Sequence, residues 1–450
     1  MVQMENMETS LINWANRFEQ ACKQNSLVKE HEIYIEAYQS DHFLCQIDRR
    51  GRWNGRPIQT SSTTFEFSCT IILQNGQQAR KQYSSQLQQS PQQIVEELIQ
   101  GAGNHALTIT GRQKYHHLSL EIWDPRYPRM NMDHRVELFE WNISTLRGIN
   151  KNVRIKRYEL TEEEHFRLYH SSKNATRLEK YTVYYFKGEL YDALTEEIFT
   201  PCLSSHRFAD ISSQILGLSY FEKRGNLPAY TKPVEDDFLL ILPARIVANI
   251  IELLYPAFDL EKIETNESFL SGKQGERIGS ERVHLLDNGL LPSGYHSRSF
   301  DASGYPPRIL TLINEGIFQD CYVRKTIGQQ SPTGHLDFEE RLWPGNLLIH
   351  NGRRSQNMVL AERSKALLAS ELAAPIQLDI KTGQLHIAAN YHVISSNGIE
   401  GDLGVKEIDC HIINLLQLVL ETTNDQNRST FIDSSSWVLE NCSLFLGEMI

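Results

Sequence analysis

Near the start of the chain, apolar residues recur every three or four positions, which is the period of an amphipathic helix. This pattern predicts a helix over residues 10–24. Further along, apolar and polar residues alternate, so strands are expected over residues 33–37, 43–47 and 65–69. The tripeptide Gln74-Asn75-Gly76 predicts a hairpin turn after the last of these strands.

The segment that begins at Ser90 carries the signals of a helix start. Ser90 can cap the first turn, Pro91 suits the first helical position, and Gln93 can complete a capping box. Gly101 suits the end of the same helix. A turn is also expected over residues 51–57.

The middle of the chain mixes helix and strand signals. Thr161 followed by three glutamates reads as a capping-box start with acids in the first turn, so a charged helix is expected there. Residues 181–186 have a β-rich composition. Residues 238–242 predict a buried strand, and an amphipathic helix is expected to begin at Pro243.

After about residue 268, glycines and prolines punctuate short apolar runs, which is typical of a mostly β region. A late helix is expected over residues 412–420. We therefore predict an α+β protein with two domains. Residues 1–230 would form an N-terminal α/β two-layer domain with a mainly antiparallel sheet. Residues 231–450 would form a C-terminal twisted, β-rich domain with a sandwich-like or barrel-like sheet.

Composition narrows the class of protein without naming a function. The 450 residues carry a formal charge of −11, which argues against a protein that coats nucleic acid. Polar and charged residues interrupt the apolar stretch 238–258, so we expect no membrane span. Seven scattered cysteines without a C-x-x-C pair indicate reduced thiols, and the polar start lacks a signal-peptide pattern. These features predict a cytoplasmic protein.

The usual catalytic and metal-binding motifs are incomplete. His31 and Glu32 begin an H-E-x-x-x-E run, but the second histidine is absent and the alternating pattern indicates a strand. His165 and His170 stand in the wrong order for a metalloprotease helix and are expected on a solvated helix face. Residues 294–298 lack the second glycine of a serine nucleophile elbow. From the residues alone we therefore predict no catalytic or metal-binding residue in this chain.

One stretch does carry a family pattern. Residues 238–326 resemble the TldD/PmbA (TldE) family of metallopeptidase subunits, and a later segment, Pro344-Gly345-Asn346-Leu347, resembles its Asn-Leu segment. The motif segments, in order, are Ser268–Glu276, Leu285–Asp287, Ser299–Arg308 and Leu312–Phe318. Ser303 replaces the glutamate that is usual in the family, and Gly345 replaces its threonine.

The matched residues also have a structural interpretation. We expect positive φ angles at four motif glycines, namely Gly272, Gly275, Gly304 and Gly316. Asp301 can cap its own turn, and Arg308 can pair with Asp301 or with a substrate carboxylate. The candidate contacts to a peptide or chamber are Phe300, Asp301, Gly304, Arg308, Gly316 and Asn346.

The resemblance implies a functional arrangement that involves a second protein. In this family, a TldD-type subunit carries H-E-x-x-x-H and binds zinc, and it pairs with a TldE-type subunit that lacks these ligands. The pair encloses a chamber that cuts unfolded peptides, including leader segments of modified ribosomal peptides. This chain has no H-E-x-x-x-H. It therefore resembles the TldE/PmbA side, which implies no cofactor here, zinc in the partner and a peptide substrate.

Two other functions stay open at the level of sequence. The chain could act alone as a binding or regulatory protein, for example a toxin or topoisomerase modulator. It could also be a degenerate peptidase that acts without a partner, through a site that the motifs do not reveal.

Overall fold

The chain folds into two compact units. The computed structural model describes residues 4–46, 57–84, 90–104, 109, 119–126, 131–149, 153–192, 198–200, 202–211, 228–232, 234, 238–326, 330–362 and 365–440. Unit 1 comprises residues 1–223, 290–307 and 332–343, and unit 2 comprises residues 224–289, 308–331 and 344–450. Two segments from the C-terminal half of the sequence, 290–307 and 332–343, thus belong to unit 1.

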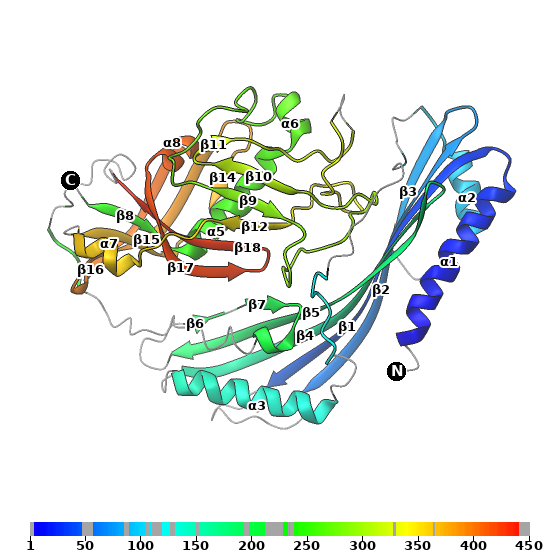
Figure 1. Ribbon diagram of the computed structural model, residues 1–450. Helices are drawn as coiled ribbons and strands as arrows, with labels where there is room; N and C mark the ends of the chain where they lie inside the picture. The colour runs from blue at the N-terminus through cyan, green and yellow to red at the C-terminus, as the bar shows by residue number, and fades with distance from the viewer. Residues whose placement is uncertain are drawn as a thin grey trace. The chain divides into compact units, whose positions relative to one another are not determined.

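Unit 1 is built on a long antiparallel sheet with the strand order β3-β2-β1-β4-β5-β6, in which β7 also pairs with β5. Figure 1 shows α1 and α2 near one end of these strands and α3 near the other. The strands are β1 (Val28–Gln46), β2 (Ile58–Leu73), β3 (Gln78–Ser84), β4 (Val153–Ser171), β5 (Asn174–Asp192), β6 (Ile198–Phe199) and β7 (Cys202–Ser205), and the helices are α1 (Met4–Gln24), α2 (Pro91–Gln100) and α3 (Met132–Ile149).

Several local predictions in unit 1 are confirmed. The predicted first helix lies inside α1, and its apolar side chains, including Trp14 and Phe18, are buried against the sheet. Ser90 and Gln93 form the expected capping box of α2, which ends at Gly101. The hairpin turn with Gly76 joins β2 to β3. The turn expected over residues 51–57 falls almost wholly outside the described residues.

Two local predictions are wrong, and the sheet explains both. Residues 33–37 and 43–47 do not form separate strands, because the polar residues between them pair on both sides; Ser40, for example, lies opposite Ser62 and Glu163. The glutamates after Thr161 do not start a helix but lie in β4. There β4 pairs with β1 on one side and with β5 on the other, and this pairing overrides the local capping signal. Glu162 bonds Arg135 of α3.

Unit 2 is built on a mixed sheet with the strand order β11-β10-β9-β12-β18-β8-β13-β15-β14, in which β16 pairs with β15 and β17 with β18. Its strands are β8 (Leu239–Leu242), β9 (Leu285–Asn288), β10 (Ile309–Asn314), β11 (Ile317–Phe318), β12 (Asn346–Ile349), β13 (Ala366–Leu372), β14 (Gln377–Leu378), β15 (Gln384–Ser395), β16 (Gly398–His411), β17 (Val419–Ser429) and β18 (Ile432–Leu439). Its helices are α5 (Ala244–Leu254), η3 (Tyr255–Phe258), α6 (Leu260–Glu264), α7 (Gln356–Glu362) and α8 (Ile412–Gln417).

The predicted strand-to-helix connection organises the core of unit 2. Strand β8 leads through Pro243 into α5, whose predicted apolar stripe is fully buried. The start of α5 is tied to β18, because the Ser436 hydroxyl accepts a bond from the Ala244 N–H and the Ser434 hydroxyl donates to the Ala244 carbonyl. The late helix is confirmed as α8, although it ends at Gln417 and residues 419–420 belong to β17. The α+β class, with an antiparallel N-terminal sheet and a large mixed C-terminal sheet, is thus confirmed.

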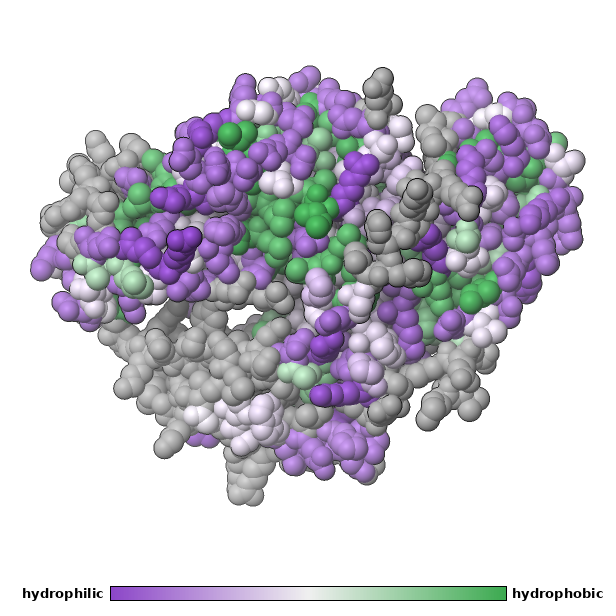
Figure 2. Space-filling view, in the orientation of Figure 1, coloured by the Kyte–Doolittle hydropathy of each residue, from purple (hydrophilic) through white to green (hydrophobic). Residues whose placement is uncertain are grey.

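The polarity of the surface and the state of the cysteines bear on the predictions made from composition. Figure 2 shows hydrophilic residues over most of the visible surface, with a hydrophobic area where β9, β10 and β12 lie in Figure 1. Among the described helices, none is both long enough and apolar enough to cross a bilayer. Cys202 is exposed and most other described cysteines are buried, and none of them forms a disulfide.

Candidate functional site

The motif residue Asp301 is buried at the centre of a turn in unit 1. Its carboxylate accepts bonds from the backbone N–H groups of Ser303 and Tyr305, each at 3.0 Å, and from the Leu336 N–H at 3.1 Å. Burial raises the pKa of Asp301, although these donors and the nearby Arg298 act in the opposite direction. The prediction that Asp301 caps its own turn is therefore confirmed. The Asp301 carboxylate, which was a predicted partner of Arg308, bonds these backbone N–H groups instead.

Two further motif residues pack around Tyr169 of β4. The rings of Phe300 and Tyr169 are 6.4 Å apart at their centroids. Gly304 has φ of +76°, and a Cβ atom there would lie 2.4 Å from the Tyr169 ring. Both the backbone angle and the close approach therefore require glycine. The Tyr169 hydroxyl donates to Glu32 of β1 at 2.9 Å, which fixes the ring.

The remaining motif residues lie in unit 2. Gly316 has φ of +75°, and a Cβ atom there would lie 2.1 Å from the Gly279 carbonyl oxygen. The side-chain amide of Asn346 is buried and donates to the Asn288 carbonyl at 2.8 Å. Arg308, by contrast, is exposed at the start of β10. The expected positive φ is found at all four motif glycines, Gly272, Gly275, Gly304 and Gly316. A contact of these residues with peptide stays a prediction.

A buried arginine lies on the face of the N-terminal sheet opposite α1. Arg167 of β4 is only 4% exposed and bonds Glu36 of β1 and Glu179 of β5, each at 3.3 Å. Its guanidinium also lies over the rings of Tyr181 and Trp343, at 4.0 and 4.7 Å from their centroids. The sequence analysis did not predict this charged group. Its signal was the polar residues, such as Glu36, that alternate with the apolar residues of β1.

The charges of this group stabilise one another. Burial alone would raise the pKa of Glu36, but Arg167 and His165 outweigh that effect and hold it below its usual value. Burial opposes the positive charge of Arg167, yet Tyr181 and Glu36 raise its pKa. The Tyr181 hydroxyl donates to Glu36 at 2.7 Å. An arginine held in this way is suited to fixing structure rather than to binding an incoming carboxylate.

The same group anchors the two segments that reach unit 1 from the C-terminal half of the sequence. Glu179 accepts a bond from the Ser299 N–H at 2.7 Å. The fully buried Arg298 donates to the carbonyls of Gly334 and Trp343 at 3.0 and 2.6 Å. Its guanidinium lies 4.2 Å from the Trp343 ring centroid. Segments 290–307 and 332–343 are thereby joined to each other and to the sheet.

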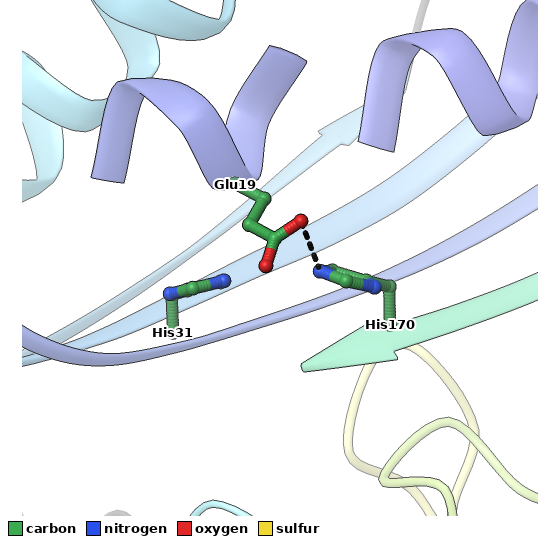
Figure 3. A group of neighbouring side chains, drawn as sticks. All are labelled: Glu19, His31 and His170. Atoms are coloured by element: carbon green, nitrogen blue, oxygen red, sulfur yellow. Dashed lines mark ion pairs between the residues drawn. The ribbon is translucent and has the colours of Figure 1, made fainter. Parts of the chain in front are cut away.

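Two groups among the described residues have the side chains of a metal site. One is exposed and consists of His386, Glu407 and Asp409. The other consists of Glu19 of α1, His31 of β1 and His170 of β4, and its ligand atoms all lie within 4.8 Å of one another. Figure 3 shows both imidazoles beside the carboxylate, with the ion pair between Glu19 and His170 at 3.7 Å.

The buried histidines correct one expectation from the sequence. Neither His165 nor His170 lies on a solvated helix face: both are buried in β4, where His170 lies opposite Ile33. Burial lowers the pKa of His31 to about 4 and also lowers the pKa of His170, so both rings are neutral at neutral pH. The strand predicted for His31 is confirmed. No sequence signal joins Glu19, His31 and His170, because the register of β1 and β4 and the packing of α1 on the sheet bring them together.

Comparison with known proteins identifies the C-terminal part of the chain. Residues 236–444 match the family model of the PmbA/TldA metallopeptidase C-terminal domain. An uncharacterised protein of Methanocaldococcus jannaschii is 25% identical over 140 residues, which are 30% of this chain and 32% of that protein. The chain thus matches about a third of the length of this curated relative.

Solved structures share the fold across nearly the whole chain. A Thermotoga maritima protein described as a candidate modulator of a DNA gyrase has a TM-score of 0.77 and 16% identity, with 96% of this chain and 99% of that chain covered. A similarly described protein of Bacteroides thetaiotaomicron has a TM-score of 0.75 and 14% identity, with 95% of this chain and 97% of that chain covered. TldE from Thermococcus kodakarensis has a TM-score of 0.75 and 17% identity, with 97% of this chain and 98% of that chain covered.

Proposed function

Because the chain belongs to the TldD/PmbA family, we propose that it is the non-catalytic, TldE-like subunit of a heteromeric zinc metallopeptidase in the cytoplasm. The observation that carries this proposal is the match of residues 236–444 to a metallopeptidase C-terminal domain in a sequence without H-E-x-x-x-H. The catalytic zinc would then lie in a TldD-like partner. The substrates would be unfolded peptides or leader segments of modified ribosomal peptides.

In this proposal the chain forms part of the chamber wall and holds the peptide. Strand β16 pairs with β15 along one edge, and an isolated bridge from Ala229 reaches Asp402 on the other. Within the described residues, no strand pairs with that other edge over residues 403–411. An extended peptide could add there as a further strand, using main-chain hydrogen bonds that accept many sequences.

We place the partner-facing surface at the start of β10. Ile309 is 54% exposed there, next to the exposed motif residue Arg308. The hydrophobic area in Figure 2 lies over the same strand. An exposed apolar patch of this kind is typical of a protein–protein contact, and an adjacent arginine can bind a carboxylate.

The test is reconstitution with the TldD-type subunit from the same genome. The two untagged chains are mixed, their association is measured by size-exclusion chromatography with light scattering, and cleavage of an unstructured fluorogenic peptide is followed. We expect cleavage only when both chains are present. Cleavage by this chain alone would instead indicate a degenerate peptidase that acts without a partner, and a failure to associate would also contradict the proposal.

Matched variants separate the two surface roles. Ile309→Asp is expected to abolish association, whereas Ile399→Asp, at a residue 44% exposed on β16, should preserve it. Arg308→Ala is expected to preserve association but lower cleavage about tenfold, the equivalent of losing roughly 1.4 kcal/mol of binding. The exposed Arg282→Ala serves as its control. Equal effects of Arg308→Ala and Arg282→Ala would remove the proposed contact.

A second candidate function comes from the two structures described as candidate gyrase modulators. In that case the chain would act alone on a topoisomerase. Supercoiling by purified gyrase, measured with and without the isolated chain, distinguishes the two functions. A stoichiometric change in supercoiling without a partner subunit would favour this second function.

A further inference from the structure

Three side chains meet between α1 and the N-terminal sheet, and we propose that Glu19, His31 and His170 bind a divalent transition-metal ion, with zinc as the best match. Each comes from a different element, namely α1, β1 and β4. Their ligand atoms lie within 4.8 Å of one another, so small side-chain movements would bring all three onto one ion. This site is independent of the proposed partner subunit and of its zinc.

The donor set fits this class of ion. Two imidazole nitrogens and one carboxylate oxygen are ligands that zinc accepts, usually with four in total. Three protein ligands leave one position for water or a small anion. Both rings are buried, and the neutral form that burial favours is the form that binds a metal.

The buried ring nitrogens are the second observation that points to a ligand. Within the described part of the chain, the Nε2 atoms of His31 and His170 are buried and make no hydrogen bond. A buried polar atom that makes no hydrogen bond costs about 1–3 kcal/mol. The His170 Nε2 atom only faces the Glu19 carboxylate, at 3.7 Å, so an ion bound between the three side chains would supply both nitrogens with the partner they lack at bonding distance. In Figure 3 both imidazoles lie beside the Glu19 carboxylate.

Neighbouring groups hold the ligands in place. The other nitrogen of His170, Nδ1, lies 2.9 Å from the Thr176 hydroxyl, an outer contact of the kind that orients metal-bound histidines. The Phe18 ring packs edge-on against His31 at 6.1 Å between centroids. Glu19 follows the buried Phe18 in α1, so packing of this helix on the sheet brings its carboxylate to the two rings.

An ion can also reach the site from solvent. The Glu19 side chain is 25% exposed, and that of Lys23 is 66% exposed. The Lys23 ammonium nitrogen lies 2.6 Å from a carboxylate oxygen of Glu19. Such a surface ion pair contributes about 0.3–0.5 kcal/mol, so an arriving cation can displace the lysine. A bound ion would then link α1 to two strands of the sheet, which gives the site a structural role.

The experiment uses the untagged full chain after treatment with a chelator. Zinc binding is measured by calorimetry and cobalt binding by visible absorption, which reports the coordination geometry. We expect one equivalent of either ion, cobalt bands of a four- or five-coordinate site, and a higher Tm with zinc. Absence of saturable zinc binding by the folded wild-type chain would overturn the proposal.

Variants of each ligand and its neighbours locate the ion. His31→Gln and His170→Gln are each expected to weaken zinc binding by more than about 100-fold, and Thr176→Val by about tenfold as an outer-contact residue. Lys23→Gln should strengthen binding slightly, because it removes the competing cation.

The exposed second group provides the control. His386→Gln should leave zinc binding unchanged, since that histidine belongs to the other cluster. Wild-type affinity in both His31→Gln and His170→Gln, or loss of binding in His386→Gln, would disprove the assignment. If the buried variants do not fold by circular dichroism, Glu19→Gln and Thr176→Val decide the outcome, because both replace residues near the surface.

Discussion

The two faces of the N-terminal sheet are buried by different kinds of interaction. On the face that α1 and α2 cover, β1 presents Ile33 and Ile35 to an apolar core with Trp14. On the opposite face, β1 presents Tyr34 and Glu36. Segments 290–307 and 332–343 belong to unit 1, as this sheet does. One face is stabilised by removing apolar surface from water, and the other by pairing charges that are already out of water.

The difference shows why the register of β1 is strictly determined. A slip of one residue would place Glu36 in the apolar core and Ile35 beside Arg167. The apolar face tolerates changes of shape, since apolar contacts have no strict direction. The charged face does not, because Glu36 and Glu179 share Arg167 as their arginine and their other bonds also have fixed directions. Perturbing one face at a time should therefore give different results.

The largest effect is expected on the charged face. Arg167→Met should destabilise the protein by about 3–5 kcal/mol, because it leaves Glu36 and Glu179 buried without their counter-charge. Urea unfolding followed by circular dichroism measures the change. Adding Glu36→Gln and Glu179→Gln to Arg167→Met should restore part of the stability. A loss below 1 kcal/mol in the single variant would show that the charges are solvated.

The second effect tests how tightly Gly304 is held against this face. Gly304→Ala should cost about 3 kcal/mol, the sum of positive-φ strain and overpacking against Tyr169. Gly272→Ala is its control, because φ there is +75° but nothing lies near a Cβ atom. That variant should cost only about 1 kcal/mol. Equal losses in thermal unfolding would show that the contact with Tyr169 contributes nothing.

The smallest effect is a pH dependence on the charged face. Burial lowers the pKa of His206 to about 4, although the carbonyls of Thr182 and Gly294 face its ring and oppose the shift. The unfolded chain takes up this proton near pH 6.5. The stability from neutral His206 is therefore complete above about pH 6.5 and is lost as the pH falls toward 4.

The measurement compares unfolding free energies at pH 7 and 4.5. The wild type should lose about 2 kcal/mol more than His206→Asn over this interval. Phe208→Leu, at a nearby apolar position, controls for general loss of packing. Identical pH slopes for the wild type and His206→Asn would show that the two carbonyls keep the ring protonated throughout.

Local sequence was sufficient for features whose partners are near in the chain. The capping box at Ser90, the turn at Gly76 and the apolar stripe of α5 depend on residues within one or two turns of each other. The positive φ of the motif glycines and the cap at Asp301 are equally local. Their energies are set by backbone geometry and nearest neighbours, so the sequence alone predicts them.

Tertiary structure decided the features whose partners are distant. The glutamates after Thr161 carry a helix signal, yet pairing with β1 and β5 places them in a strand. Glu36 meets Arg167 across 131 positions of sequence, and His31 meets His170 across a similar distance. Strand register sets these encounters, and register is fixed by burying a whole face of the sheet at once. A local pattern therefore reveals which side chains share a face, and only the folded sheet determines which of them meet.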